Sequence, residues 1–339
     1  MKQRNYNLDL LRVVLSIMVI TIHIANYFCR GYVNLSSYEY VFSLLLNTLS
    51  RISVPCFLML SGYLLLDRNE SVEKTLKRST QMLCVLVVWD IIYYIFNTYY
   101  TQQTKLKFTE LINTPAEAHL WYLYVLVPVY FCLPFLQSML RNIDDKTKQY
   151  LLILGSIWVG ILWILYINYE KPYYNLPTFG QNSYIFYLFC GYYIKTNQDK
   201  MKNLFKTKYC FGIYTLLSII TTLIVFNASV SKGKHIDRWL AYGSPLMIIA
   251  AICFFIFILN IKIDWTKHSK VTNVIKICSD CSFGVYLFHV IVLDHYKLAY
   301  KAGIHNAFIA TPILLIGIYI LSIFVVLLMR KINIGKQIT

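Results

Sequence analysis

Charged residues are scarce in this chain. Only 14% of its 339 residues are Asp, Glu, Lys or Arg, and 58% are hydrophobic, whereas soluble domains carry about 25% charge. Proline and glycine are also few, at 8 and 13 residues, and no stretch reads as a long linker or a low-complexity tail. These shortages exclude a soluble domain for most of the chain, whose side chains we expect to face lipid or other helices.

Acidic residues are half as numerous as basic ones, 16 against 32, so the net charge is +16. In a soluble protein such a charge suggests binding to nucleic acid. Here the basic residues lie in short segments between apolar runs, which is the distribution that orients membrane helices. No basic stripe, zinc knuckle or aromatic RNA-binding motif accompanies them. We therefore expect membrane lipids, and no nucleic acid, among the partners.

A disulfide framework is also missing, because the nine cysteines are odd in number and dispersed. Most lie in or beside apolar runs, where a thiol behaves as a small hydrophobic group. Cys278 and Cys281 form one C-x-x-C pair. A zinc site needs about two further ligands at a compatible spacing, and none lies nearby. We expect no metal.

Ten apolar stretches predict membrane spans, each of which takes about 17 to 25 residues. They indicate an all-α integral membrane protein with a single membrane-embedded domain over residues 1–339. The sixth stretch is short and rich in Tyr and Phe, so we expect it to be tilted, interfacial or packed inside the bundle. The stretches are 8–28, 40–66, 80–100, 119–140, 150–169, 182–195, 208–228, 240–260, 274–297 and 307–330.

The basic residues also predict the orientation of the spans. With a cytoplasmic N-terminus, 21 Lys and Arg fall on the inner side, 9 on the outer side and 2 within spans; the outer segment 170–181 has only Lys171. This asymmetry predicts that both termini are cytoplasmic. The first span is not a removable signal peptide, because Asp9 and Arg12 lie at its start and no small-residue cleavage site ends it.

Ionisable side chains within the spans are candidates for a functional site, because a charge there costs about 2.5 to 3.5 kcal/mol. Arg12 and His23 are eleven residues apart in the first span. On a helix they lie within roughly 20° of one face and about 16 Å apart along the axis. The alternative for Arg12 is a snorkelling anchor or an ion pair with Asp9. The same alternative is weaker for His23, which is too deep to snorkel readily and has no obvious partner nearby in the sequence.

In the second span, Pro55 cannot donate a hydrogen bond to the carbonyl of Arg51, so a helix break is expected beside the guanidinium. Ser61 and Gly62 follow one to two turns later. Together these residues favour a helix that lines a polar cavity. The alternative is a kinked packing helix whose Arg51 pairs with Asp90 of the third span.

Two further histidines lie in later spans. His119 begins the fourth span with Trp121 and Tyr122, and His289 follows Tyr286 in the ninth. The alternatives are an interfacial aromatic belt for the first and a core histidine bonded to a neighbouring helix for the second.

The predicted topology puts the candidates at similar depth. His23, Arg51, His119 and His289 all fall in the middle or outer half of the bilayer, as a shared site requires. The other four histidines, which are assigned no role, are His235, His268, His295 and His305.

These residues carry a resemblance to the acyltransferase 3 family of membrane-bound acyltransferases. The motifs occur in the family's order over nearly the whole chain: Arg12 with His23, 50–64, 119–122, Pro134 and 282–289. The resemblance implies ten membrane helices in the cell (inner) membrane and transfer of an acyl group to a hydroxyl of a cell-surface polysaccharide or lipid-linked sugar. The donor is usually acetyl coenzyme A, a co-substrate rather than a permanently bound cofactor.

The roles follow from what acyl transfer requires, which is a base for the hydroxyl proton and a cation or donor for the oxyanion. We expect His23 to be the base, Arg51 to stabilise developing charge or hold the donor, and Arg12 to meet coenzyme A phosphates. An alternative mechanism forms a covalent acyl-histidine intermediate. Ser61 is a weaker candidate for a nucleophile, because no G-x-S-x-G elbow surrounds it. The other candidates for donor or acceptor binding are Ser61, Asp90, His119, Trp121, Tyr122, Tyr286 and His289.

A transporter of a polysaccharide or lipid-linked precursor is the alternative function, since it also needs a polar cavity among many helices. The sequence shows no clear internal repeat in two halves, which many transporters have. A structural or sensory subunit would leave Arg51 and His23 without a purpose. The resemblance and the clustered ionisable residues favour the O-acyltransferase.

Overall fold

The chain is mostly helical in the part that the computed structural model describes, which comprises residues 4–32, 35–102, 106–169, 184–204, 206–300 and 306–339. No strand occurs in those ranges. Within them, nine helical segments are long and apolar enough to cross a membrane. The predicted all-α membrane fold is therefore confirmed. The outer segment 170–181, with Lys171, lies outside the described residues.

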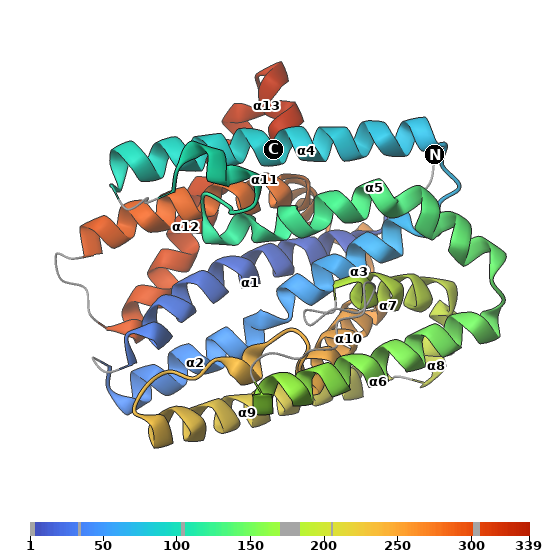
Figure 1. Ribbon diagram of the computed structural model, residues 1–339, viewed down its shortest axis with the longest axis horizontal. Helices are drawn as coiled ribbons and strands as arrows, with labels where there is room; N and C mark the ends of the chain where they lie inside the picture. Colours follow the sequence, from blue (N-terminus) through green and yellow to red (C-terminus); the bar gives the residue numbers. More distant parts are fainter. Residues whose placement is uncertain (1–3, 33–34, 103–105, 170–183, 205, 301–305) are drawn as a thin grey trace. The chain divides into compact units, whose positions relative to one another are not determined.

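Each predicted span corresponds to one helix or to two helices in series (Figure 1). The helices are α1 Tyr6–Arg30, α2 Ser37–Arg51, α3 Ser53–Leu65, α4 Val72–Ile95, α5 Trp121–Asn142, α6 Asp145–Tyr169, α7 Tyr184–Thr196, α8 Gln198–Leu204, α9 Thr207–Lys232, α10 Pro245–Asn260, α11 Ser269–Tyr300, α12 Ala307–Met329 and α13 Asn333–Ile338. The predicted sixth span forms α7, which has 13 residues where a full span takes about 20. Most of its side chains are buried, which favours packing inside the protein.

The helices form two compact units. The first comprises Met1–Arg68 and Gln137–Ser279, and the second comprises Asn69–Leu136 and Asp280–Thr339. The first therefore contains α1 to α3 and α6 to α10, whereas the second contains α4, α12 and α13. Both α5 and α11 contribute to each unit. The prediction of a single domain over the whole chain stays a prediction.

In the first unit, α1 packs against α2, α3 and α10. Asn5 begins α1 by accepting hydrogen bonds from the amides of Asn7 and Leu8, which satisfies two otherwise unpaired helix donors. The break expected beside Pro55 is confirmed, since α2 ends at Arg51 and α3 begins at Ser53. Pro55 then lies in the first turn of α3, where a missing amide proton costs nothing.

Contact between α3 and α7 is unusually close at two glycines. A Cβ added to Gly62 would lie 2.0 Å from the carbonyl oxygen of Leu188, and one added to Gly191 would lie 1.9 Å from that of Met59. The two helices therefore touch backbone to backbone in both directions. In the Ser-Gly pair of the second span, Gly62 therefore has a packing role, and Ser61 beside it is partly exposed.

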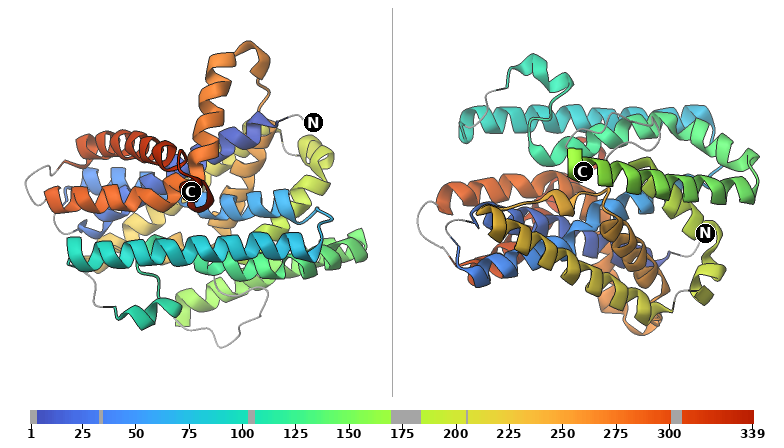
Figure 2. Two further views of the ribbon diagram at one scale, coloured as in Figure 1. Left: turned by 90° about the horizontal axis from the view of Figure 1, so that it is seen from above. Right: turned by 60° about the horizontal axis from the view of Figure 1, so that its bottom comes forward.

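Helices α9 and α10 lie side by side (Figures 1 and 2). Gly233 ends α9 with φ +63°, a left-handed conformation that glycine adopts at low cost. Pro245 begins α10 at its first turn, where proline is favoured. The intervening segment, 234–244, belongs to the first unit and bears on the site.

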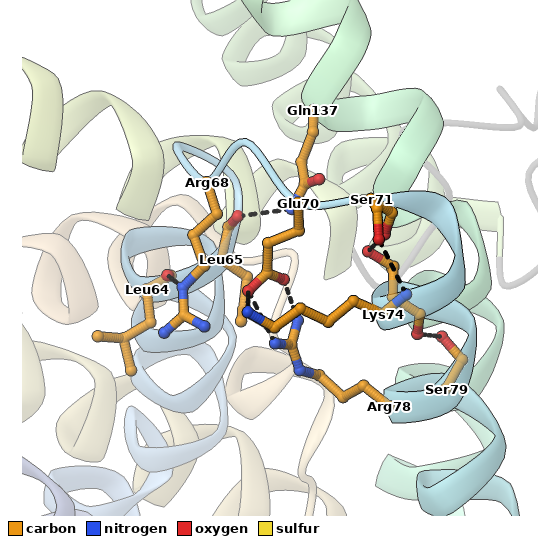
Figure 3. Close-up of polar contacts among 10 residues, drawn as sticks. Leu64, Leu65, Arg68, Glu70, Ser71, Lys74, Arg78, Ser79 and Gln137 are labelled. Atoms are coloured by element: carbon orange, nitrogen blue, oxygen red, sulfur yellow. Dashed lines mark hydrogen bonds and ion pairs between the residues drawn. The ribbon is translucent and has the colours of Figure 1, made fainter.

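The second unit is organised around α4, whose N-terminus carries a compact charge cluster (Figure 3). The carboxylate of Glu70 accepts two hydrogen bonds from Arg78, at 2.6 and 3.0 Å, and pairs with Lys74 at 3.4 Å. Ser71 caps the helix by accepting from the amide of Lys74. At its other end α4 continues into a short π-helix, Phe96–Tyr100. The C-terminal α13 packs on α4, where Trp89 Nε1 donates to the carbonyl of Ile338 at 2.8 Å.

Candidate active site

The carboxylate of Asp9 is the centre of a buried charge cluster in the first turns of α1. Only 2% of Asp9 is exposed. It accepts hydrogen bonds from Arg4, at 2.5 and 3.2 Å, from Arg12 at 3.3 Å and from Ser279 at 2.8 Å. A buried carboxylate needs such partners because its desolvation is costly. The expected alternative of an Asp9–Arg12 ion pair is thus confirmed, yet the Arg12 side chain is still 32% exposed.

His23 lies on the same unbroken helix as Arg12. Eleven residues of α-helix separate their axial positions by about 16 Å and bring them back to nearly the same face. His23 is partly exposed, although the residues on either side of it, Ile22 and Ile24, are buried. Arg12 and His23 thus lie on one face of α1 and are both partly exposed, whereas Ser16 and Val19, between them on that face, are buried.

Arg51 is held by the segment that precedes α10. Its Nε donates to the carbonyl of Leu240 at 3.2 Å, and its guanidinium lies 5.4 Å from the centre of the Tyr242 ring. Tyr187 of α7 fixes Tyr242 in turn, by donating to its carbonyl at 2.7 Å. The terminal nitrogens of Arg51 make no hydrogen bond with any residue that the structure describes. Its position is therefore fixed while two nitrogens retain donor capacity.

A histidine without a predicted role lies close to this arginine. His235 Nδ1 and Ser229 Oγ are each 2.8 Å from the hydroxyl of Tyr40, and the amide of Ile236 donates to Ser229 Oγ at 3.0 Å. Burial lowers the pKa of His235; the charge of Asp237 opposes this shift, and the charge of Arg51 adds to it. No local signal marks His235, because its partners are up to 195 residues away.

In the second unit, His119 lies among three aromatic rings. Its ring centre is 4.9 Å from that of Tyr93, 5.5 Å from Tyr286 and 5.2 Å from His289. His119 is 3% exposed and His289 is fully buried. The structure thus brings together three residues that the sequence predicted, from two spans more than 160 positions apart.

The hydrogen bonds of this cluster define one tautomer. His289 Nδ1 lies 2.7 Å from the carbonyl of Tyr286, and a carbonyl can only accept, so Nδ1 carries a proton. The other ring nitrogen, Nε2, is then the basic one in the neutral imidazole. The hydroxyl of Tyr286 donates to the carbonyl of His119 at 2.7 Å, which ties the short 3₁₀ helix before α5, Ala118–Leu120, to α11.

Trp121 and Tyr122 extend the same aromatic surface. The Tyr122 ring is 5.8 Å from Tyr286 and 6.1 Å from Trp121, both near-perpendicular contacts. All three side chains are partly exposed. They can therefore offer ring faces and polar tips to a ligand.

Asp90 holds the polypeptide that leads to His119. Its carboxylate accepts from the amide of Ala116 at 3.0 Å and from the hydroxyl of Tyr124 at 2.7 Å. Asn97 donates to the carbonyl of Ala116 at 2.9 Å and to Glu117 at 3.0 Å. Both backbone groups of Ala116 are thus fixed by α4 and the π-helix after it. The sequence does not single out Asn97, because an amide costs less than a charge to bury and is less unusual within a span.

The ten predicted residues thus fall into two groups. Arg12, His23, Arg51 and Ser61 belong to the first unit, and the other six belong to the second. Among the described residues no group of three His, Cys, Asp or Glu could hold a metal ion. Cys278 and Cys281 are free thiols.

The match with a protein family covers almost all of the chain. Residues 5–331 match the family described as an acyltransferase domain, the acyltransferase 3 family. Comparisons with curated proteins and with solved structures return no match. The chain therefore belongs to the acyltransferase 3 family and is a membrane acyltransferase.

Proposed function

We propose that this protein transfers an acetyl group from acetyl coenzyme A to a hydroxyl of a cell-surface polysaccharide or lipid-linked sugar, in the cell (inner) membrane. The observation that carries the proposal is the placement of Arg12 and His23, both partly exposed, on one face of the unbroken helix α1. The glycan acceptor is proposed partly because the sequence of segment 239–247 resembles that of the enterobacterial common antigen O-acetyltransferase, a resemblance that the comparison with curated proteins does not return.

His23 is the base in this mechanism. Its imidazole takes the proton of the acceptor hydroxyl as the oxygen attacks the thioester carbonyl, and returns that proton to the departing thiolate. An acid–base group of this kind contributes about 100- to 10,000-fold in rate. An imidazole suits both steps because its pKa is near neutrality.

Arg51 stabilises the negative charge that develops on the carbonyl oxygen. A fixed cation with unused donors is suited to this task because little reorganisation is needed when the charge forms. The bond to Leu240 and the contact with Tyr242 supply that fixation. Arg12 binds phosphate of coenzyme A, and its partial neutralisation by Asp9 limits the charge that it exposes.

The acceptor sugar is assigned to the aromatic group of the second unit. Trp121, Tyr122 and Tyr286 are partly exposed and offer ring faces, and the buried His119 and His289 pack beside Tyr286. Asp90 and Asn97 act as positioning residues, because they hold Ala116, three residues before His119.

The test uses sealed vesicles of known orientation that contain the protein and its native glycan, with labelled acetyl coenzyme A on one side only. We expect acetylation of the glycan when the donor is on the cytoplasmic side, and a loss of about 100-fold or more for His23→Ala. His268→Ala is the matched control, an exposed histidine outside the spans.

Three outcomes would contradict the proposal. Transfer at the normal rate by His23→Ala would remove the base, and equal acetylation from an externally confined donor would overturn the sidedness. Net movement of a sugar or lipid-linked sugar without any thioester-dependent transfer would favour the transporter. Mass spectrometry of glycans from cells with and without the protein identifies the acyl group by its mass.

A further inference from the structure

A pocket of about 740 Å³ lies at the N-terminal end of α1. Residues 4–7, the segment 261–266, and Ser269 and Thr272 of α11 line it. All of these residues belong to the first unit. The pocket is in the size range of small-molecule sites, about 300 to 1,000 Å³.

One side chain holds the walls of this pocket together. Asn7 Nδ2 donates to the carbonyls of Leu259 and Ile261, at 3.0 and 2.9 Å, and Asn7 Oδ1 accepts from Trp265 Nε1 at 2.9 Å. The segment that follows α10 is therefore tied to α1 by three hydrogen bonds. The pocket is formed before any ligand arrives.

Two aromatic rings line the pocket. The rings of Tyr6 and Trp265 are 6.0 Å apart at an angle of 39°. The indole N–H of Trp265 is already used by Asn7, so what the residue offers is its ring face. A ring face held in place is suited to stacking with a planar heterocyclic base.

The charges of the lining favour an anion. Arg4 and Lys262 are the cations of the lining and Asp264 is its single acid. Arg4 also donates twice to Asp9, a carboxylate that it shares with Arg12. Asp264 is engaged, since it accepts from the hydroxyl of Thr266 at 2.5 Å and pairs with Lys267 at 3.3 Å. A site that combines fixed rings with a net positive charge selects a planar base that carries phosphate.

The pocket is linked to the proposed donor site through Asp9. Arg4, in the pocket wall, and Arg12, further along α1, both donate to the Asp9 carboxylate. From Tyr6 to His23 the helix advances by about 26 Å. A donor with a nucleotide at one end and a thioester at the end of a long arm suits this separation.

We infer that this pocket binds the adenine-nucleotide end of the acyl coenzyme A donor, with the base on Trp265 and Tyr6 and phosphate at Arg4 and Lys262. The inference rests on the proposed function and names the nucleotide subsite of the same reaction. Arg12 then binds coenzyme A phosphate where the thioester arm of the donor leaves the pocket and extends along α1.

Direct binding to the purified full-length protein tests the inference without turnover. The probes are acetyl coenzyme A and adenosine 3′,5′-bisphosphate, which has the base and phosphates but no thioester arm. We expect the bisphosphate to compete with acetyl coenzyme A. Trp265→Ala should weaken both by about 5- to 150-fold, the equivalent of about 1 to 3 kcal/mol, and Lys262→Ala by about two- to fivefold.

Two control variants separate stacking from folding. Trp265→Phe keeps a ring face and should retain most of the affinity for both probes. Lys270→Ala removes an exposed lysine of α11 outside the pocket lining and should bind as the unaltered protein does. If Trp265→Ala does not fold, Lys262→Ala and the competition between the probes decide the question.

The two proposals fail in different ways. If acetyl coenzyme A binds with unchanged affinity to Trp265→Ala and Lys262→Ala, or if the bisphosphate does not compete, the pocket assignment is wrong and the proposed function stands. If the unaltered protein binds no acetyl coenzyme A and transfers no acetyl group, the proposed function fails and this inference fails with it.

Discussion

Alanine at position 62 should force α3 away from α7. Its Cβ would lie 2.0 Å from the carbonyl oxygen of Leu188 and 2.7 and 2.8 Å from the carbonyl carbon and Cα of the same residue. Because these atoms are backbone, no change of rotamer relieves the clash. The helices have to separate by about 1 Å or more to restore van der Waals distances.

The cost follows from that separation. A gap of about 0.5 to 1 Å forfeits a quarter to a half of each dispersion contact across the interface, and overpacking of a tight contact costs about 1 to 3 kcal/mol. A backbone clash belongs at the upper end of that range. Replacing glycine by alanine within a helix returns about 1 kcal/mol. We therefore expect Gly62→Ala to lower the free energy of unfolding by about 2 kcal/mol.

Two other glycines serve as matched controls. A Cβ at Gly160 of α6 or at Gly212 of α9 would meet no atom within 4 Å, so alanine there should stabilise by up to about 1 kcal/mol. Gly191→Ala should cost about as much as Gly62→Ala, because its Cβ would lie 1.9 Å from the carbonyl oxygen of Met59. The double variant should cost less than the sum, since one separation relieves both clashes.

The assay is reversible unfolding of the purified variants in one detergent or lipid system, which gives differences in the free energy of unfolding. Activity in membranes reports separately on function. If Gly62→Ala is as stable as Gly160→Ala, the close contact of α3 with α7 does not exist and the reasoning fails.

Four further predictions concern three single variants and the orientation of the termini. Arg51→Lys should insert normally yet lose most of its transferase activity, because an ammonium does not reproduce the guanidinium fork; normal turnover of a well-expressed variant would make Arg51 a packing residue. Arg12→Ala should raise the apparent KM for acetyl coenzyme A more than it lowers kcat, and steady-state kinetics that show the reverse would contradict a role in donor binding. Burial lowers the pKa of His235, so the unfolded chain binds a proton at this residue more readily than the folded protein does. The free energy of unfolding should therefore fall as the pH drops below about 6.5. His235→Gln should flatten that dependence, and an unchanged pH profile in the variant would show that His235 does not cause it. Single reactive cysteines at the two termini should resist labelling by an impermeant reagent in intact cells, and labelling of either end from outside would overturn the predicted topology.

Composition and order along the chain were sufficient to predict the class of fold. Because bilayer hydrocarbon cannot satisfy backbone polar groups, apolar runs of this length become helices whatever surrounds them. The break beside Arg51 is equally local, since Pro55 lacks an amide proton wherever it occurs. The placement of Arg12 and His23 on one face needed only the helical repeat.

Tertiary structure decided which partners those residues have. Asp9 pairs with Arg12 one turn along the same helix, but it also accepts a hydrogen bond from Ser279, 270 positions away. Arg51 is fixed by Leu240, and His119 lies beside Tyr286 and His289. No periodicity encodes these pairings, because they depend on which helices pack together and at what register.

The pocket at the start of α1 is also a feature that the tertiary structure decides and the local sequence does not predict. Asn7 and Trp265 are ordinary residues in their local sequence, and only the return of the chain after α10 brings them within 2.9 Å. Hydropathy determines that a segment enters the membrane, since the cost of exposing polar groups to lipid is a property of the segment alone. Close packing between distant segments determines which side chains share a site, since it depends on the shapes of both surfaces at once.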